Sequence, residues 1–479
     1  MRGINGFAAS VTFAAFAAGA SSASPAASLI KPAQSSAASE VAEGAQAGAS
    51  IETIFQQWLS AFNSGDRTTI KAFYKKYLDD AYSKFAMETA QDTCGLAIER
   101  VEQQSPSTMT VLLHERCLPG KQRVKIELAT PNSASFKVLD ITPLALPGSG
   151  AVKTTATIAG RLATRDDFAG SIIIARHGER LLARSWGFAD PIRRAPMTLD
   201  TPMFLASAGK MFTAVAVLQL VDAGKINLDA PLGQYLIDYL NKDMARVTVR
   251  QLLTHRGGTG DIGILGREDG ANRARIRTID DMVRLNGTRD PDFPPGSKAD
   301  YSNYGFILLG AVMEKVTGGS YYDYVAEHVF EPAGMTKSGF PDRDHLQGVA
   351  VGYTRFFGAE PKLVPNTDVL PWRGASAVGG VSTPNDMMRF LYAMKDGKLL
   401  SPTMFKLATT AGATTWYGMG FVVNAEQQSW GHGGNSYGMD VAVHYYGNLD
   451  TAFVCLATRD MVCNWLIWAW NLRTTGPAR

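Results

Sequence analysis

A serine and a lysine stand three residues apart in the apolar stretch FLASAGKMFTAVAV, residues 204–217. On a helix, residues i and i+3 share a face, so the Ser207 hydroxyl and the Lys210 amine would lie side by side. A serine hydroxyl needs a nearby base to become a nucleophile at neutral pH. Burial lowers the pKa of a lysine, so a buried Lys210 could take the serine proton. The alternatives are a lysine that snorkels to the surface and a chance spacing, which recurs at Ser28 and Lys31 without the apolar context.

A phenol and an amide precede the next long apolar helix, in the stretch DYSNYGF. Tyr301 could relay a proton to a leaving group, and Asn303 could hold a substrate. The structural alternative makes Asn303 a helix N-cap and Tyr301 a packing residue. Both interpretations remain open from this segment alone.

A third segment, WGHGGNSYGMD, combines a histidine with several glycines. Glycines let the backbone approach a substrate closely, with His432 at the edge and an amide N–H placed to hold an oxyanion. The structural alternative is a glycine-rich turn that leads into a strand.

The order of these three motifs resembles that of the class C β-lactamase and penicillin-binding-protein-like serine hydrolases. S-x-x-K, Y-x-N and H-x-G follow one another from about residue 155 onward, with supporting landmarks in VTVRQLLTHRGG, PPGSKADYSNYGF and GGVSTPNDMMRF. The resemblance implies an α/β fold, in which helices flank an antiparallel sheet and an inserted helical region borders the site. It implies that Ser207 accepts an acyl group, that Lys210 is the base and that Tyr301 shuttles the proton.

The resemblance also assigns the groups that would contact the substrate. Asn303 would contact the amide or ester flank, and the backbone N–H groups of Ser207 and Asn435 would form the oxyanion hole. His432 and Gly434 complete the third motif on this side of the site.

The third motif departs from the Lys-Thr-Gly of these β-lactamases, because this chain has His432, Gly433 and Gly434 there. A missing lysine removes the fixed positive charge that would anchor a substrate carboxylate. H-x-G is similar to the pattern in esterase and D-aminopeptidase members of the family. The expected substrates are therefore small esters, amides or peptides without a C-terminal carboxylate. A β-lactamase, a D-Ala-D-Ala carboxypeptidase and a catalytically silent binder of cell-wall peptides are the alternatives.

Competing motifs are weaker. GNSYG would make Ser436 the nucleophile of an α/β-hydrolase, but a strand is expected after it where that fold needs a helix. GTGDIG follows a helix, which argues against a phosphate-binding loop. The sequence has neither H-E-x-x-H nor paired C-x-x-C, and its seven histidines are scattered, so no metal and no cofactor are predicted.

Composition limits the class of partner. The chain has 479 residues, 46% of them hydrophobic, and a formal net charge of +3. So small a charge argues against nucleic acid as a partner, and no segment reaches the length of a membrane span. The sequence makes no prediction of oligomeric state.

Composition also changes along the chain and predicts four segments. Residues 1–23 resemble a signal peptide, which predicts a secreted or periplasmic protein. Residues 24–50 are rich in Ala, Ser and Gly and predict a flexible linker. Residues 51–145 predict a small α+β domain, loosely similar to the nuclear-transport-factor-2-like (NTF2-like) fold. After a linker at LALPGSGAV, the hydrolase domain is expected over 151–479.

One antiparallel sheet is expected around the motifs, closed by strands distant in sequence. A hairpin is predicted over 171–187, and the last strands are predicted at 416–423, 440–447 and 450–457. The apolar run from residue 204 is predicted as a helix that ends at Gly224. Other helices are expected at 248–255, 278–286, 304–318, 320–330, 384–395 and from Met461 onward.

Export would allow the four cysteines to form disulfides. Cys94 and Cys117 flank two predicted strands that turn near Ser105 and Pro106, and a symmetric hairpin would place them opposite each other. A disulfide and two free thiols are both open there. Cys455 and Cys463 are expected to be two buried thiols, with a disulfide as the alternative.

Overall fold

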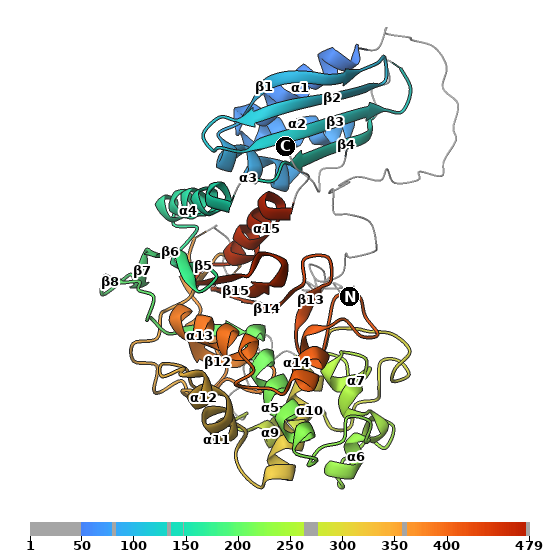
Figure 1. Cartoon of the computed structure of the whole chain (residues 1–479), viewed down its shortest axis with the longest axis vertical. Coiled ribbons are helices and arrows are strands. Elements are labelled where there is room, and N and C mark those ends of the chain that lie inside the picture. The colour runs from blue at the N-terminus through green and yellow to red at the C-terminus, as the bar shows by residue number, and fades with distance from the viewer. Residues whose placement is uncertain are drawn as a thin grey trace, which may run out of the picture. The chain divides into compact units, whose positions relative to one another are not determined.

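The computed structural model describes residues 49–78, 83–131, 136–146, 148–262, 276–356 and 362–475 (Figure 1). These residues form two compact units. Of the described residues, the smaller unit contains those from 49 to 166 and from 465 to 475, and the larger unit contains those from 167 to 464. The predicted signal peptide and nearly all of the predicted linker lie outside the described residues. No helix among the described residues is long and apolar enough to cross a membrane.

The smaller unit packs helices on an antiparallel sheet. Helix α1 lies on one face of that sheet (Figure 1). The described sheet runs in the order β1 (Leu96–Gln104), β2 (Thr108–Glu115), β3 (Lys121–Leu128), β4 (Phe136–Pro143). The described helices are α1 (Ile51–Ser64), α2 (Arg67–Tyr77), α3 (Ser83–Thr93), α4 (Gly148–Thr164) and the greater part of α15 (Val462–Thr475).

Local sequence explains the predicted break between the first two helices. Gly65 ends α1 in the left-handed conformation at φ 60°, and Asp66 caps α2 by accepting a hydrogen bond from Thr69 N at 2.7 Å. Helix α4 was not predicted, because its buried residues include small ones such as Ala151 and Ala159, which give little apolar periodicity. The linker expected at LALPGSGAV therefore contains the start of a helix.

A buried ion pair joins the two ends of the smaller unit. The Arg473 guanidinium on α15 lies 2.9 Å from the Glu115 carboxylate on β2, and both side chains are almost fully buried. Gln122 donates a further hydrogen bond to this carboxylate. Trp465 Nε1 also donates to Asp92 at 2.7 Å. Residues near the C-terminus thus complete the core of the N-terminal unit.

Both pairs of cysteines are bonded. Cys94 and Cys117 lie 5.7 Å apart between Cα atoms, where the predicted hairpin brings them opposite each other. The expectation of two buried thiols at Cys455 and Cys463 is wrong, because these residues also form a disulfide. Helix α15 begins one residue before Cys463 and turns it back towards strand β16, a reversal that the apolar pattern did not indicate.

The larger unit is built on the predicted antiparallel sheet. Its strands run in the order β13-β14-β15-β16-β5-β6, so the first strand of the unit pairs with the last, with Ile173 opposite Val454. The predicted closure by sequence-distant strands is confirmed. The strands described in this unit are β5 (Gly170–Arg176), β6 (Glu179–Trp186), β7 (Phe188–Asp190), β8 (Ala195–Pro196), β9 (Met203–Ala206), β10 (Tyr353–Thr354), β11 (Val364–Pro365), β12 (Gly379–Ser382), β13 (Val422–Asn424), β14 (Ser429–Ser436), β15 (Met439–Tyr446) and β16 (Thr451–Ala457).

Helices flank this sheet and account for most of the large hydrophobic core. Helix α5 is buried on almost all sides and contacts α10, α11 and α14. The described α-helices are α5 (Lys210–Asp222), α6 (Leu232–Tyr235), α7 (Val249–Leu253), α9 (Ile279–Asn286), α10 (Asn303–Thr317), α11 (Tyr321–Val325), α12 (Glu331–Ala333), α13 (Pro384–Lys395) and α14 (Pro402–Thr409). Shorter turns are the 3₁₀ segments η2 (Ser207–Gly209), η3 (Met244–Arg246), η5 (Thr367–Val369) and η6 (Gly447–Leu449), and the π segment η4 (Ala326–Phe330).

Three predicted elements differ from those observed. The helix expected from residue 204 starts as strand β9, continues as η2 and becomes α-helical only at Lys210; it ends before Gly224 at φ 68°, as predicted. A short apolar run fits a buried strand as well as a helix. The helix expected over 320–330 divides into α11 and η4. The strand expected over 416–423 shortens to β13, because Gly420 adopts φ 85° just before it.

The glycine-rich third motif is also different from the expected turn. Residues 429–436 form strand β14, and the turn comes after Ser436. Gly431 and Gly434 in this strand allow close backbone contacts, so the segment combines extended structure with tight packing.

Candidate active site

Ser207 is held at a sharp corner between a strand and a helix. Ala206, just before it, has φ 44° and ψ −131°, a conformation that costs a non-glycine residue on the order of 1–3 kcal/mol. Strand β9 pairs with β12, and a Cβ on Gly209 would overlap Gly379. This close contact keeps the corner rigid and fixes the direction of the Ser207 side chain.

The Lys210 amine is fully buried and touches three oxygen atoms. Its Nζ lies 2.6 Å from Asn303 Oδ1, 2.7 Å from the Ala377 carbonyl oxygen and 3.2 Å from Ser207 Oγ. The first two oxygens can only accept, so they bind two N–H groups. A neutral amine has two N–H groups and one lone pair, and the lone pair is then left for the serine hydroxyl.

Burial is also what makes the neutral amine available. It lowers the pKa of Lys210 from its usual value near 10.5 to about 7, although the nearby Asp261 charge acts in the opposite direction. A large part of Lys210 is therefore unprotonated at neutral pH.

Tyr301 lies close to the same amine and to Ser207. The Lys210 Nζ atom is 4.8 Å from the centre of the Tyr301 ring. Burial raises the pKa of Tyr301 well above its usual value, and its hydrogen bond with Ser207 opposes this change. The phenol is thus protonated at neutral pH and can donate a proton, while the lysine can accept one.

Asn303 is oriented by a carboxylate that the sequence did not single out. Asp261 accepts hydrogen bonds from Asn303 N at 3.1 Å and from Asn303 Nδ2 at 3.2 Å. Because the carboxylate only accepts, the amide oxygen of Asn303 must face Lys210. The N-cap of α10 is Ser302, which accepts from Gly305 N at 3.0 Å, so the alternative role of Asn303 as the cap is wrong.

His432 is buried and carries no charge at neutral pH. Its Nδ1 contacts the Gly433 carbonyl oxygen, which can only accept, so Nδ1 carries the proton. Nε2 is then the acceptor for the Tyr417 hydroxyl at 3.0 Å. Burial, followed by the nearby Lys210, lowers the pKa of His432 to about 3. The third motif thus supplies no fixed positive charge, and the ring faces Tyr417.

The backbone of the third motif lies against the serine corner. A Cβ on Gly434 would overlap the Leu205 carbonyl oxygen and come within 3.0 Å of Ser207 N. Strand β13 pairs with β14 only as far as Gly431, and beyond that point the serine corner lies beside β14. The next residue is Asn435, whose side-chain amide contacts Asp440 at 3.3 Å and Met461 Sδ at 2.7 Å. The structure therefore brings all three motifs together.

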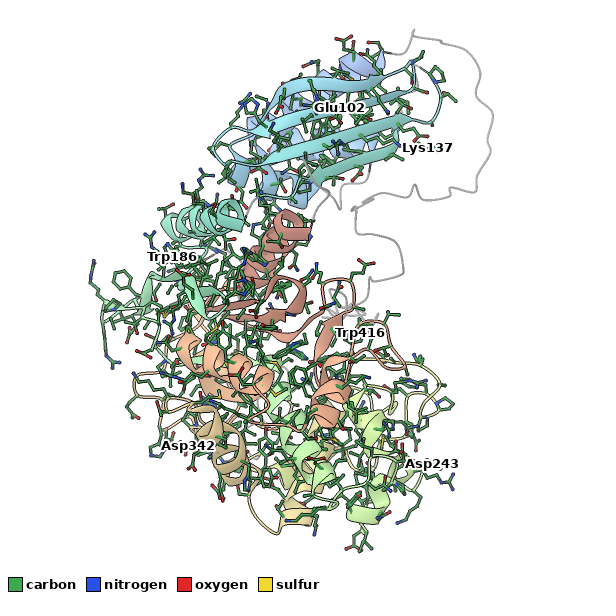
Figure 2. All side chains as sticks on the ribbon, in the orientation of Figure 1. Glu102, Lys137, Trp186, Asp243, Asp342 and Trp416 are labelled. Atoms are coloured by element: carbon green, nitrogen blue, oxygen red, sulfur yellow. A yellow bond between two sulfur atoms is a disulfide. The ribbon has the colours of Figure 1, made fainter. Side chains whose placement is uncertain are left out.

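Several polar groups of the site were not predicted. Ala377 contributes only its backbone carbonyl, which no side-chain pattern reveals, whereas Asp261, His255 and Tyr417 act from loops. Trp416, beside Tyr417, lies on the segment between α14 and β13 (Figure 2). Ser436 lies at the end of β14 and is followed by a strand, as expected for a residue outside a nucleophile elbow. Within the described ranges, no group of three or more His, Cys, Asp or Glu side chains could hold a metal ion.

Comparison with known proteins places most of the chain in one group. Residues 155–461 match the protein-family model described as beta-lactamase. Esterase EstB of Burkholderia gladioli is 32% identical over 256 residues, which are 47% of this chain and 64% of that protein. A D-aminopeptidase of Brucella anthropi is 29% identical over 277 residues, 55% of this chain and 51% of that protein. The chain thus spans between half and two-thirds of the length of these relatives.

Solved structures share the same fold. A penicillin-binding protein from Bacillus halodurans superposes with a TM-score of 0.58 at 28% identity, covering 64% of this chain and 98% of that protein. A D-amino acid amidase from Ochrobactrum anthropi SV3 superposes with a TM-score of 0.57 at 22% identity, covering 67% of this chain and 96% of that protein. The predicted fold class of the larger unit is confirmed, while the likeness of the smaller unit to the NTF2-like fold and the predicted domain limits stay predictions.

Proposed function

Because the chain belongs to the β-lactamase family, we propose that it is a serine hydrolase that forms an acyl-enzyme on Ser207. Lys210 is the base and Tyr301 is the acid. The observation that carries this proposal is the buried Lys210 amine, whose two N–H groups are bound by carbonyl oxygens and whose remaining position faces Ser207 Oγ at 3.2 Å. A surface lysine or a chance spacing would not produce this arrangement.

The reaction follows from the protonation states of these groups. Ser207 Oγ gives its proton to the Lys210 amine and bonds to the substrate carbonyl carbon. Backbone N–H groups of Ser207 and Asn435 donate to the oxygen that becomes negative. The bond to the leaving group then breaks as that group takes the Tyr301 proton. The Lys210 ammonium then gives its proton to the Tyr301 oxygen, which regenerates the phenol. Water hydrolyses the acyl-enzyme by the same steps in reverse.

The substrate class follows from the missing charge. A β-lactam or a D-Ala-D-Ala peptide carries a carboxylate, and the neutral, buried His432 offers no cation to bind it. We therefore propose esters, amides or peptides without a terminal carboxylate as substrates. The esterase and D-aminopeptidase names among the relatives support this class. The alternatives are a β-lactamase, a D-Ala-D-Ala carboxypeptidase and a silent binder of cell-wall peptides.

The proposal is tested by labelling with a fluorophosphonate probe and by turnover of nitrophenyl butyrate. Ser207→Ala is expected to abolish labelling and to lower turnover by at least about a thousandfold, because the nucleophile is lost. Ser436→Ala is the matched control and should keep both. Turnover of the ester should far exceed that of nitrocefin. An unlabelled wild-type protein would indicate the silent binder, and a preference for nitrocefin would overturn the substrate class.

Export is a separate proposal, which rests on residues 1–23 alone. The mature protein in the periplasm or medium should begin near residue 24 when its N-terminus is measured by mass spectrometry. An intact N-terminus in the cytoplasmic fraction would contradict it.

A further inference from the structure

We propose that His255 is a positioning residue that orients Tyr301 by holding the backbone on both sides of it. The proposal rests on the proposed role of Tyr301 as the acid. His255 follows α7. The sequence indicated no role for it, and it appeared only within the segment VTVRQLLTHRGG that supports the family resemblance.

Three contacts connect His255 to the segment that carries Tyr301. The His255 carbonyl oxygen accepts from Asp300 N at 2.9 Å, and the ring Nδ1 accepts from Ser302 N at 3.1 Å. The ring itself lies against the Tyr301 ring, with 4.3 Å between the centroids. One residue thus binds the chain before Tyr301, the chain after it and the phenol ring.

The ring of His255 must be neutral to make these contacts. A backbone N–H donates to Nδ1, so the proton of the neutral ring is on Nε2. Protonating Nδ1 would direct an N–H at the Ser302 N–H and break the contact. Burial and the nearby Lys210 favour the neutral ring, since they lower its pKa well below the usual value.

The surroundings of the other ring nitrogen, Nε2, indicate that Nδ1 is the nitrogen that matters at this position. Nε2 is buried and has no hydrogen-bond partner among the described residues. The His255 ring is surrounded by three aromatic rings, with centroids 4.6 Å away for Tyr417, 5.2 Å for Phe306 and 6.4 Å for Trp416. An unpaired buried N–H is unfavourable, and a phenylalanine would fill the same space without it. The acceptor atom Nδ1 therefore gives the histidine a function that phenylalanine could not supply.

Two substitutions separate the acceptor from the ring. His255→Asn keeps an oxygen that can accept from Ser302 N, and asparagine tolerates the left-handed φ of 54° found here. His255→Phe keeps the aromatic contact with Tyr301 and loses the acceptor. Thermal unfolding of both variants measures any general loss of stability.

The readout is the dependence of kcat/KM on the leaving group, measured with ethyl butyrate and nitrophenyl butyrate. Nitrophenolate leaves without an acid, whereas ethoxide needs the Tyr301 proton. A small displacement of a catalytic group costs up to about a hundredfold, so His255→Phe should lower kcat/KM for the ethyl ester about 10- to 100-fold. For the nitrophenyl ester, His255→Phe should lower kcat/KM by less than about threefold, because nitrophenolate leaves without the Tyr301 proton. His255→Asn should have a kcat/KM near that of the wild type on both esters. In a Tyr301→Phe background, His255→Phe should have no further effect.

The outcomes distinguish this proposal from the proposed function. Equal losses on the two esters, or an additive loss in the Tyr301→Phe background, would show a merely structural role and overturn the positioning role alone. A full rate on the ethyl ester for His255→Phe would do the same. If Ser207→Ala or Tyr301→Phe kept full activity on the ethyl ester, the proposed function itself would be wrong.

Discussion

Replacing Asp261 by asparagine should shift the pH profile of kcat/KM to lower pH. The proposed base is the neutral Lys210 amine, so kcat/KM should rise as pH increases through the pKa of Lys210, which is about 7. The Asp261 charge stabilises the protonated amine and raises this pKa. Asparagine has nearly the same shape and keeps an oxygen that can accept from Asn303 N, but it removes the charge. The amine then loses its proton more easily, and activity extends further into the acid range.

The size of the shift follows from the distance through Asn303. The Asn303 amide oxygen is 2.6 Å from Lys210 Nζ, and its amide nitrogen is 3.2 Å from Asp261 Oδ2. With about 2.3 Å between the two amide atoms, the charges are at most about 8 Å apart. Their interaction is about 0.5 kcal/mol at the dielectric constant of water and about 2 kcal/mol at an effective value near 20. The pH midpoint should therefore fall by about 0.4 to 1.5 units.

The assay measures kcat/KM for nitrophenyl butyrate between pH 5 and 9 at low ionic strength. The shift should shrink in about 1 M salt, because screening then acts over about 3 Å. Asp280→Asn on α9 is the matched control, since that carboxylate pairs with Arg284 on the same helix. A midpoint in Asp261→Asn that stays in place or moves to higher pH would refute the assignment of the acid limb to Lys210.

Two further substitutions test the same site. Lys210→Met should raise the melting temperature relative to wild type at pH 6 and should lose this advantage towards pH 10. At any pH below the pKa of the unfolded lysine, which is near 10.5, folding of the wild-type protein must either bury the charged amine or release its proton, and both cost free energy. This cost disappears once the lysine of the unfolded chain is also neutral. A gap in melting temperature that does not depend on pH would show that the buried lysine has an ordinary pKa. Gly434→Ala should lower kcat about a hundredfold or more, because its Cβ would push β14 away from the Leu205 carbonyl oxygen and Ser207 N. Gly412→Ala is the control, because a Cβ there has no other atom within 4 Å. Equal rates for the two variants would contradict the close contact at Gly434.

The elements with strong end signals were predictable from the sequence. Helix α13 has Thr383 as its N-cap and Pro384 in its first turn, and its observed bounds are those expected. Strands β5 and β16 have continuous apolar runs, were both predicted as strands, and are buried in the middle of the sheet. In these places the local pattern and the final packing favour the same structure.

The elements that were not predicted depend on contacts distant in sequence. The run before Ser207 forms β9 because β12 is available to pair with it, and nothing in the run itself indicates that partner. The φ of 44° at Ala206 is equally hidden, since alanine gives no sign of a left-handed conformation. The sharp corner that presents the nucleophile is therefore a product of tertiary structure.

The candidate site divides in the same way. Ser207, Lys210, Tyr301 and Asn303 were found because each belongs to a short motif beside an apolar helix. Asp261 was seen only as part of a rejected phosphate motif. Groups that act through a backbone carbonyl, such as Ala377, or through a contact across a loop leave no local pattern. A sequence can thus suggest the reacting atoms before it reveals what orients them.

The ion pair between Arg473 and Glu115 has a consequence for biosynthesis. A ribosome makes Glu115 hundreds of residues before Arg473, so this carboxylate lacks its cationic partner until α15 has been made. A lone buried charge of this kind is worth about 3–5 kcal/mol of instability. The smaller unit is therefore expected to reach its final form only after α15 has been made, although most of its residues are synthesised much earlier.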